Sequence, residues 1–130
     1  MIEINLNTAR FKLEIKGHAQ PEETSMFKEI CASISAIAQG LVYSVAKYES
    51  DHNAIQEMDY RDEPGDFLWR VKPDPWAEAL VRKRMYAYGD ALEMMAACNP
   101  ESVKMIYDGE EVQPMPKEDE NNGEQETADS

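Results

Sequence analysis

The feature that most constrains the fold of this chain is an apolar stripe in which large aliphatic side chains recur at steps of three and four residues. Its members are Ile30, Ile34, Ile37, Leu41 and Val45. This spacing predicts one amphipathic helix that begins between Ser25 and Lys28 and ends near Tyr48. The residues between the stripe members are mostly small: Ala32, Ser33, Ser35, Ala36, Ala38 and Gly40. A helix with so few bulky side chains can lie close against a sheet or a second helix.

Segments with strand patterns lie on both sides of this helix. Residues 2–6 and 11–16 alternate apolar and polar side chains around a turn at 7–10, so they are predicted to pair as a hairpin. Further strands are predicted at 55–60, where the pattern is ragged, at 67–72 and at 103–107.

A second helix is predicted from Pro75 to Cys98. Asp74 stands at the N-cap position and Pro75 at the first helical position, a combination that is typical of helix starts. The pair Asn99-Pro100 ends the helix. Its buried stripe is predicted to consist of Trp76, Leu80, Ala87, Ala91, Met94 and Cys98.

The element order strand, strand, helix, strand, strand, helix, strand predicts a small single α+β domain. Strands joined by short turns form a mostly antiparallel sheet, and the two helices pack on one face of it. The domain is predicted to span residues 1–108. Residues 109–130 are predicted to form a disordered acidic tail, because the stretch 117–130 carries six acids, one base and no aliphatic side chain larger than alanine.

Composition argues against several classes of function. The chain has a formal net charge of −13, whereas proteins that bind nucleic acid or an anionic membrane surface need a surplus of lysine and arginine. No run of eighteen apolar residues indicates a membrane span. No glycine-rich phosphate loop is present and no third ligand stands near either histidine, so we expect neither a cofactor nor a metal. Two cysteines without CxxC spacing suggest neither a disulfide framework nor a zinc site. We therefore expect the protein in the reducing cytoplasm.

The chemistry of the chain is concentrated in one histidine and one cysteine. His18 follows the second predicted strand and Cys31 lies near the start of the first helix, so the two can meet at one edge of the sheet. A histidine beside a cysteine can take its proton and leave the nucleophilic thiolate. A helix N-terminus would add a partial positive charge and N–H groups for an oxyanion, but both effects fade if the helix begins at Ser25. A cysteine among aliphatic residues is more often a small buried hydrophobe, so a core role for Cys31 stays open.

The remaining candidates have plainer interpretations. Cys98, Trp76 and the Met94-Met95 pair are assigned to the core, and His52 is assigned to the solvent-exposed surface. A short basic face of the second helix is expected to be solvated; it consists of Arg82, Lys83 and Arg84.

Two segments resemble the ribosomal-processing cysteine protease family, Prp. Residues 15–19, Ile-Lys-Gly-His-Ala, are similar to the family's strand that ends in Gly-His-Ala. Residues 30–37, Ile-Cys-Ala-Ser-Ile-Ser-Ala-Ile, are similar to the family's helix, which opens on a Cys-Ala-small-aliphatic-Ser run. More loosely, residues 98–106 resemble the family's closing pattern, in which a second helix breaks and leads into a final strand. The resemblance covers roughly residues 1–108.

The resemblance implies a homodimeric cysteine endopeptidase. His18 would be the general base and Cys31 the nucleophile. Gly17 and Ser35 would support the site or bind substrate, and Ser35 lies one helical turn after Cys31 on the same side. The implied partner is a protein substrate, either the N-terminal extension of a large-subunit ribosomal protein or, for relatives that serve phages, a capsid or scaffold protein. The implied setting is the cytoplasm of a bacterium or of a phage-infected host.

The chain departs from the family pattern just ahead of Cys31. The family places Gly-x-Asp there, and the glycine lets a loop close on the substrate. Here the stretch 26–30 reads Met-Phe-Lys-Glu-Ile, so the glycine is absent and only Glu29 can replace the aspartate. A divergent active endopeptidase, phage-encoded or not, is therefore our first hypothesis. The alternatives are a catalytically silent relative that keeps the dimer as a binding or assembly factor, and a plain structural domain with Cys31 in its core.

Overall fold

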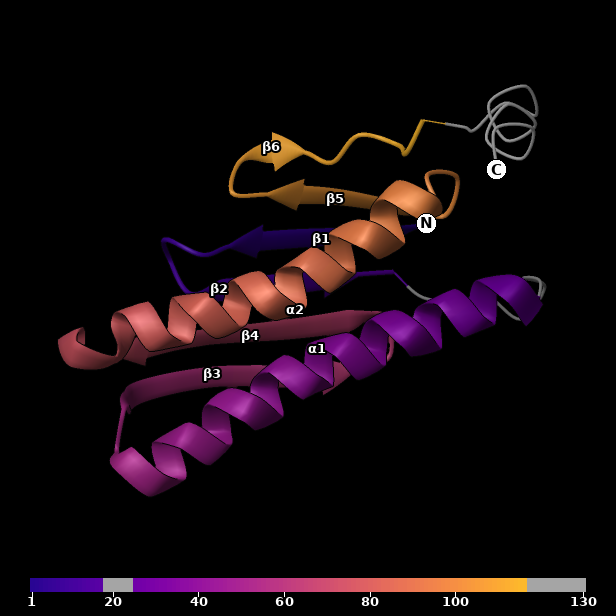
Figure 1. Ribbon diagram of the computed structural model, residues 1–130. Helices are drawn as coiled ribbons and strands as arrows, with labels where there is room; N and C mark the ends of the chain where they lie inside the picture. The colour runs from indigo at the N-terminus through magenta and orange to yellow at the C-terminus, as the bar shows by residue number, and fades with distance from the viewer. Residues whose placement is uncertain (18–24, 117–130) are drawn as a thin grey trace, which may run out of the picture.

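The structure is a computed structural model that describes residues 1–17 and 25–116, with the backbone alone at 49–52. Pairs of consecutive strands alternate with single α-helices along this part of the chain (Figure 1). The strands are β1 (Ile2–Asn7), β2 (Lys12–Lys16), β3 (Ile55–Glu63), β4 (Asp66–Pro73), β5 (Val103–Tyr107) and β6 (Glu110–Glu111). The helices are α1 (Ser25–His52) and α2 (Glu78–Cys98), and a 3₁₀ turn at Pro75–Ala77 precedes α2.

The strands form one mixed sheet in the order β3-β4-β2-β1-β5-β6. Among the described strands, β1 and β5 run parallel, with Ile2 opposite Val103, and the other neighbours are antiparallel. The parallel pair follows from its connection, because α2 carries the chain back along the sheet before β5 begins. The predicted α+β class, with a mostly antiparallel sheet, is confirmed.

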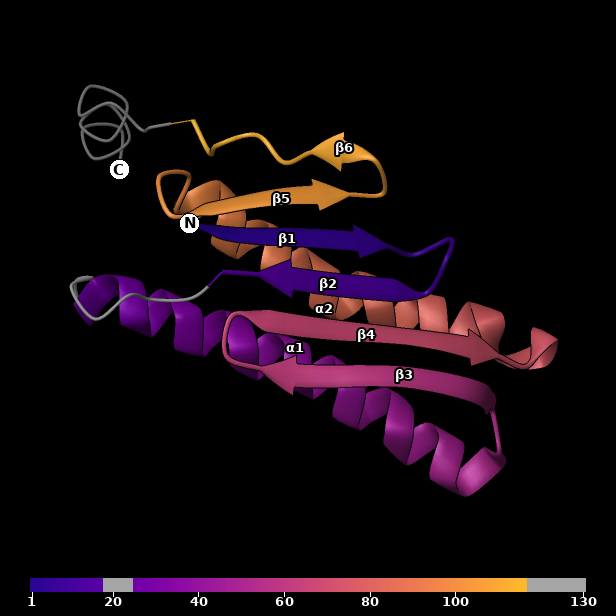
Figure 2. The same ribbon diagram turned by 180° about the vertical axis from the view of Figure 1, so that it is seen from behind.

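Both helices cover the same face of the sheet, as the front and back views show (Figures 1 and 2). The alternation in β1 turns Ile2, Ile4 and Leu6 toward the helices, and each is at most 2% exposed. Trp69 of β4, with no exposed surface, joins the same core. The opposite face is charged and carries ion pairs such as Lys16–Asp66, as expected for an antiparallel sheet with one solvated face.

The predicted stripe of α1 is the buried side of that helix. Ile30, Ile34, Leu41 and Val45 are buried, whereas Ile37 is only half-buried. Ser25–Tyr48 is also long and apolar enough, by length and composition alone, to cross a membrane. The core helix of a small α+β domain has the same properties, and here the apolar side of α1 packs on the sheet.

The buried stripe predicted for α2 is wrong. Trp76, Leu80 and Met94 are 53%, 41% and 54% exposed, and Cys98, assigned to the core, is exposed. The buried residues of α2 are Val81, Met85, Gly89, Leu92 and Ala96. Apolar residues stand on several sides of α2, and the side that meets the sheet is the one with Gly89. A Cβ at Gly89 would lie only 2.4 Å from Cδ2 of Leu6, so this glycine permits the close contact between helix and strand.

The ordered domain extends past the predicted boundary at residue 108. Glu110 and Glu111 form β6 against β5, and Val112 donates its N–H to the carbonyl of Met105 at 2.9 Å. Met115 then donates its N–H to the carbonyl of Ala97, also at 2.9 Å. The predicted disorder from residue 109 onward is therefore wrong for residues 110–115. Residues 117–130 lie outside the described part of the chain.

Tyr107 makes folding stability sensitive to alkaline pH. Burial, followed by a hydrogen bond from its hydroxyl to Asp90 (3.0 Å) and the charge of Asp90, raises the pKa of Tyr107. An unfolded tyrosine loses its proton near pH 10, before the folded one does. The stability that Tyr107 contributes is therefore complete below about pH 10 and declines as pH rises above it.

We expect Tyr107→Phe to flatten the decline of the free energy of unfolding between pH 9.5 and 11. Urea titrations across that range measure the slope. Tyr43→Phe, which removes the same hydroxyl from a side chain that is 69% exposed, is the matched control. Equal slopes in the parent and in Tyr107→Phe would contradict this account.

Candidate active site

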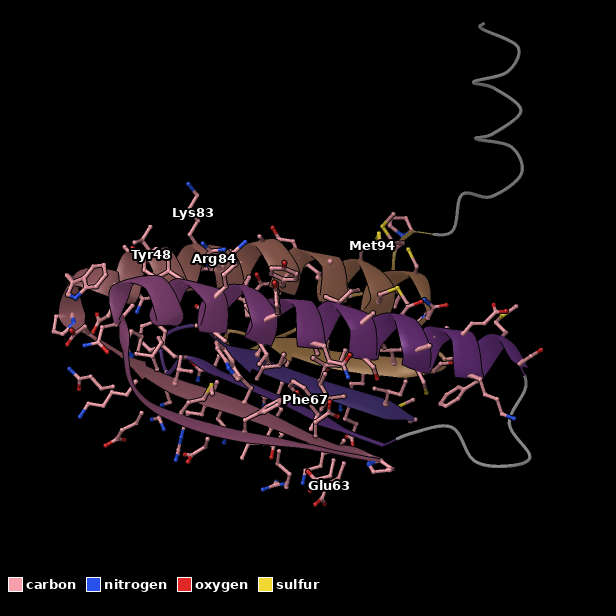
Figure 3. All side chains as sticks on the ribbon, turned by 90° about the horizontal axis from the view of Figure 1, so that it is seen from below. Tyr48, Glu63, Phe67, Lys83, Arg84 and Met94 are labelled. Carbon is pink, nitrogen blue, oxygen red and sulfur yellow. The ribbon has the colours of Figure 1, made fainter. Side chains whose placement is uncertain are left out.

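A pocket of about 330 Å³ lies between the N-terminal half of α1 and the turn that joins β3 to β4. Its apolar floor consists of Ile2, Ile15, Ile34, Ala38 and Phe67. Figure 3 shows the Phe67 ring between the sheet and α1. The remaining lining residues are Gly17, Cys31, Ser35, Asp62, Glu63, Pro64, Gly65 and Asp66. Three of the four residues singled out in the sequence, Gly17, Cys31 and Ser35, thus share one pocket, and the fourth, His18, lies outside the described residues.

Gly17, at the end of β2, has a backbone conformation that other residues rarely adopt. Its φ is +94°, and a Cβ built there would lie 2.2 Å from the carbonyl oxygen of Met1. Its N–H donates to the carbonyl of Gly65 at 3.0 Å. The residue that precedes His18 is therefore fixed between the start of β1 and the β3–β4 turn.

Cys31 is half-buried and packs against the core beside the pocket. Because α1 begins at Ser25, Cys31 stands in the second turn of the helix. The backbone N–H groups that a helix leaves unpaired belong to its first turn, and the charge effect of a helix end falls off within that turn. The helix thus begins at the residue for which the sequence analysis expects the effect of the helix N-terminus on Cys31 to fade.

Ser35 lies four residues after Cys31, and both line the same pocket. Residues four apart on a helix are neighbours on one face. The serine residue is exposed, so its hydroxyl is accessible to a molecule that enters the pocket. A thiol and a hydroxyl therefore stand side by side above an apolar floor.

The β3–β4 turn is the part of the pocket that the sequence analysis missed as a functional element. Residues 63–66, Glu-Pro-Gly-Asp, are recognisable in the sequence as a turn, but nothing in them indicates that they face α1. Asp62 binds the turn to the helix by accepting a hydrogen bond from Gln39 of α1 at 3.0 Å. Glu63 points away from α1 (Figure 3).

Basic partners neutralise Asp66, which stands opposite Lys16 at the end of β2. Asp66 accepts a hydrogen bond from Nε of Arg61 at 2.8 Å and one from Lys16 at 3.3 Å. The hydrogen bond from Arg61, together with that from Lys16, holds the pKa of Asp66 below its usual value. Burial and the neighbouring Asp62 raise the pKa of Tyr60. Among the acids that line the pocket, Asp66 is therefore paired with cations, whereas Asp62 is held by hydrogen bonds from Gln39 and Tyr60.

The chain has a Prp-like cysteine protease fold, as superposition on solved structures shows. The S. aureus ribosomal processing protease Prp, solved with a substrate peptide, superposes with a TM-score of 0.60 at 19% sequence identity, over 82% of this chain and 99% of that one. Protein SMU.848 from Streptococcus mutans gives 0.59 at 17% identity, over 82% of this chain and 90% of that one. The same S. aureus protease with a covalently linked product peptide gives 0.50 at 22%, over 82% and 96%. No protein-family model and no curated protein sequence matches the chain.

At these identities the comparisons establish the fold. The resemblance found in residues 15–19 and 30–37 is confirmed at that level, because the solved structures that superpose on the chain include the protease that the sequence pointed to. The roles of individual residues depend on the pocket itself.

Proposed function

We propose that the protein is a cysteine endopeptidase in which Cys31 is the nucleophile and His18 the general base. The observation that carries the proposal is that Gly17, the residue bonded to His18, lines the same pocket as Cys31 and Ser35. The hydrogen bond from Gly17 to Gly65 and its left-handed backbone conformation keep the end of β2 beside that pocket. The Prp-like fold supports the same assignment.

The proposed reaction is acyl transfer in two steps. His18 takes the proton of the Cys31 thiol, Sγ attacks the scissile carbonyl carbon, and His18 returns the proton to the leaving amine as the C–N bond breaks. Water then loses a proton to His18, attacks the thioester carbon and releases the acid, and Sγ leaves as thiolate. The S. aureus relative was solved with a covalently linked product peptide, which supports a covalent route. Cys31 lies past the first turn of α1, where the free N–H groups of the helix end are located. We therefore propose that the Ser35 hydroxyl, and not the helix end, donates a hydrogen bond to the substrate carbonyl oxygen.

The proposed substrate is a segment near the N-terminus of a specific protein. A ribosomal protein precursor and a phage capsid or scaffold protein are the two candidates. The net charge of −13 favours a basic segment, since opposite charges steer encounter. We propose that the enzyme acts as a homodimer in the cytoplasm of a bacterium or of its phage-infected host.

One observation favours the silent relative as a second candidate. Met26 and Glu29 occupy the stretch where the family has glycine and aspartate, and both side chains are exposed on the first turns of α1. In this chain the stretch is helical and lacks the backbone freedom that a glycine would add. A chain that binds the substrate segment without cutting it would have this fold and this pocket too.

The rate of Cys31 alkylation by iodoacetamide tests the proposal. At pH 5.5 an ordinary thiol is about 0.1% thiolate, whereas a histidine-paired thiol with a pKa near 4 is almost fully ionised. The paired thiolate is intrinsically less nucleophilic by roughly two orders of magnitude, which leaves a net advantage of about tenfold. We therefore expect Cys31 to react about tenfold faster than Cys98 at pH 5.5, as measured by mass spectrometry of the two peptides.

Cys98 is the internal control because it is an exposed thiol in the same chain. His18→Ala should abolish the advantage of Cys31 and leave the rate at Cys98 unchanged. A Cys31 that reacts more slowly than Cys98 at pH 5.5, with or without His18, would reject the ion pair and favour the binding role.

A further inference from the structure

The outer surface of the helices carries a groove of about 340 Å³ that the proposed reaction does not use. Residues of both helices line it: Tyr43, Ser44, Lys47, Tyr48, Arg84 and Tyr88. We call it the aromatic groove. Tyr48 and Arg84 lie on the side of the helices turned away from the sheet (Figure 3). The groove is therefore on the opposite side of α1 from the core.

The aromatic side chains of this groove are held in place and yet remain accessible. The guanidinium carbon of Arg84 lies 5.6 Å from the centre of the Tyr48 ring. The centres of the Tyr48 and Trp76 rings are 6.0 Å apart. Gly40 lets Tyr88 lie against α1, since a Cβ there would be 2.8 Å from the Tyr88 ring. Tyr43 nevertheless remains 69% exposed and Trp76 53% exposed.

The charge of the groove is opposite to that of the chain as a whole. None of its lining residues is acidic, and within the described part of the chain neither Lys47 nor Arg84 makes an ion pair. Lys83 extends outward next to Arg84 (Figure 3). The basic hollow on the sheet face differs, because it includes Glu14 as well as Arg70, which is paired with Asp59. Within the described residues, the aromatic groove thus offers two cations that make no ion pair, and the hydroxyls of Tyr43 and Tyr88, to a carboxylate-bearing ligand.

We propose that the acidic C-terminal segment of the same chain, residues 117–130, docks in the aromatic groove. The segment has six acids and one base. The described chain ends beside α2, because Met115 donates its N–H to the carbonyl of Ala97. Ala97 and Arg84 stand thirteen residues apart on one helix, which is about 20 Å.

The length of the segment matches this distance. The disorder that composition predicts for these fourteen residues would give them a root-mean-square span of about 20 Å, and an effective concentration at the groove on the order of millimolar. Glu124, Glu126 and Asp129 come eight or more residues after Pro116, a reach of at least about 26 Å. Glu118 to Glu120 come at most four residues after it, a reach of about 14 Å, and fall short.

Two matched variants of the full-length chain test the proposal by amide chemical shifts in ¹⁵N-labelled protein. The distal variant carries Glu124→Gln, Glu126→Gln and Asp129→Asn. The proximal variant carries Glu118→Gln, Asp119→Asn and Glu120→Gln, which changes the net charge by the same amount. We expect the distal variant alone to shift the resonances of Tyr43, Lys47, Tyr48, Arg84 and Tyr88. In 1 M NaCl, where the screening length is about 3 Å, the parent and distal spectra should coincide at these residues.

Four outcomes would overturn the proposal. The first is an equal effect of the two variants on the groove, and the second is no effect of either. The third is a shift confined to Arg10 and Lys12 on the sheet face, which would assign the segment to the other basic hollow. Groove shifts that depend on protein concentration and not on the distal acids would instead assign the groove to a second copy. None of these results depends on the activity of Cys31.

Discussion

Gly17→Ala is expected to lower the free energy of unfolding by about 4 kcal/mol. An L-residue in a left-handed conformation costs about 1–2 kcal/mol, and Gly17 has a φ of +94°. The new Cβ would also lie 2.2 Å from the Met1 carbonyl oxygen, and an overpacked contact of this kind costs typically 1–3 kcal/mol. Since the neighbouring atom is backbone, relief requires that β1 and β2 shift. Denaturation in urea, followed by circular dichroism, measures the loss.

Gly109→Ala is the matched control for this prediction. Gly109 has a similar φ of +85°, but a Cβ built there has no atom within 4 Å. Its replacement should cost only the conformational part, about 1–2 kcal/mol. If the two variants lost the same stability, the contact between Gly17 and Met1 would not hold the end of β2.

Cys31→Ala is expected to reduce peptide cleavage by at least about 10³-fold, because no acyl-enzyme can form without Sγ. The assay uses a peptide that spans the N-terminal processing site of a bacterial large-subunit ribosomal protein, and mass spectrometry detects the products. Cys98→Ala, at an exposed position near the end of α2, should retain the parental rate. Melting curves of both variants establish that they are folded.

Two results of this assay would contradict the mechanism. Unchanged cleavage in Cys31→Ala would exclude Cys31 as nucleophile. A parent protein that binds the peptide tightly and leaves it intact, while Cys31 shows no enhanced alkylation, would support the silent relative. Cleavage of the peptide that also requires His18 would establish the dyad.

The elements with a strong local pattern could be predicted from the sequence. The alternation in β1 and β2 and the stripe from Ile30 to Val45 gave elements of the right type, because in each case one face is apolar and the other is not. The segment 103–107 was assigned to a strand with the same bounds as β5. A strand or helix can be predicted from such a pattern without knowing which other element its apolar face packs against.

The orientation of α2 could not be predicted in the same way. Apolar residues stand on several sides of that helix, so Trp76 and Val81 were equally eligible for burial by pattern. The choice depends on Gly89, which admits Leu6 of a strand more than eighty residues away. The Cys98 assignment failed for the same reason, since it followed the wrong phase of the helix.

For the candidate site, the sequence singled out residues that share one pocket, whose chemical roles stay a prediction, but it did not indicate which other residues form the walls of that pocket. Gly17, Cys31 and Ser35 were recognisable from family-like segments, and the pocket brings them together. The turn at 63–66 contributes through long-range contacts, such as the hydrogen bond between Gly17 and Gly65. Contacts of this kind leave no periodicity in the sequence.

The place of β1 in the sheet has a consequence for the order of folding. β1 is synthesised before the other described strands, yet it lies between β2 and β5, with Ile2 opposite Val103. During translation the β1–β2 hairpin can form at once, but its other edge stays open until residues 103–107 have emerged. Long-range parallel pairing of this kind is slow, and an open edge invites association with other chains. Until β5 has paired with β1, nascent chains are therefore exposed to aggregation or to chaperones through this open edge.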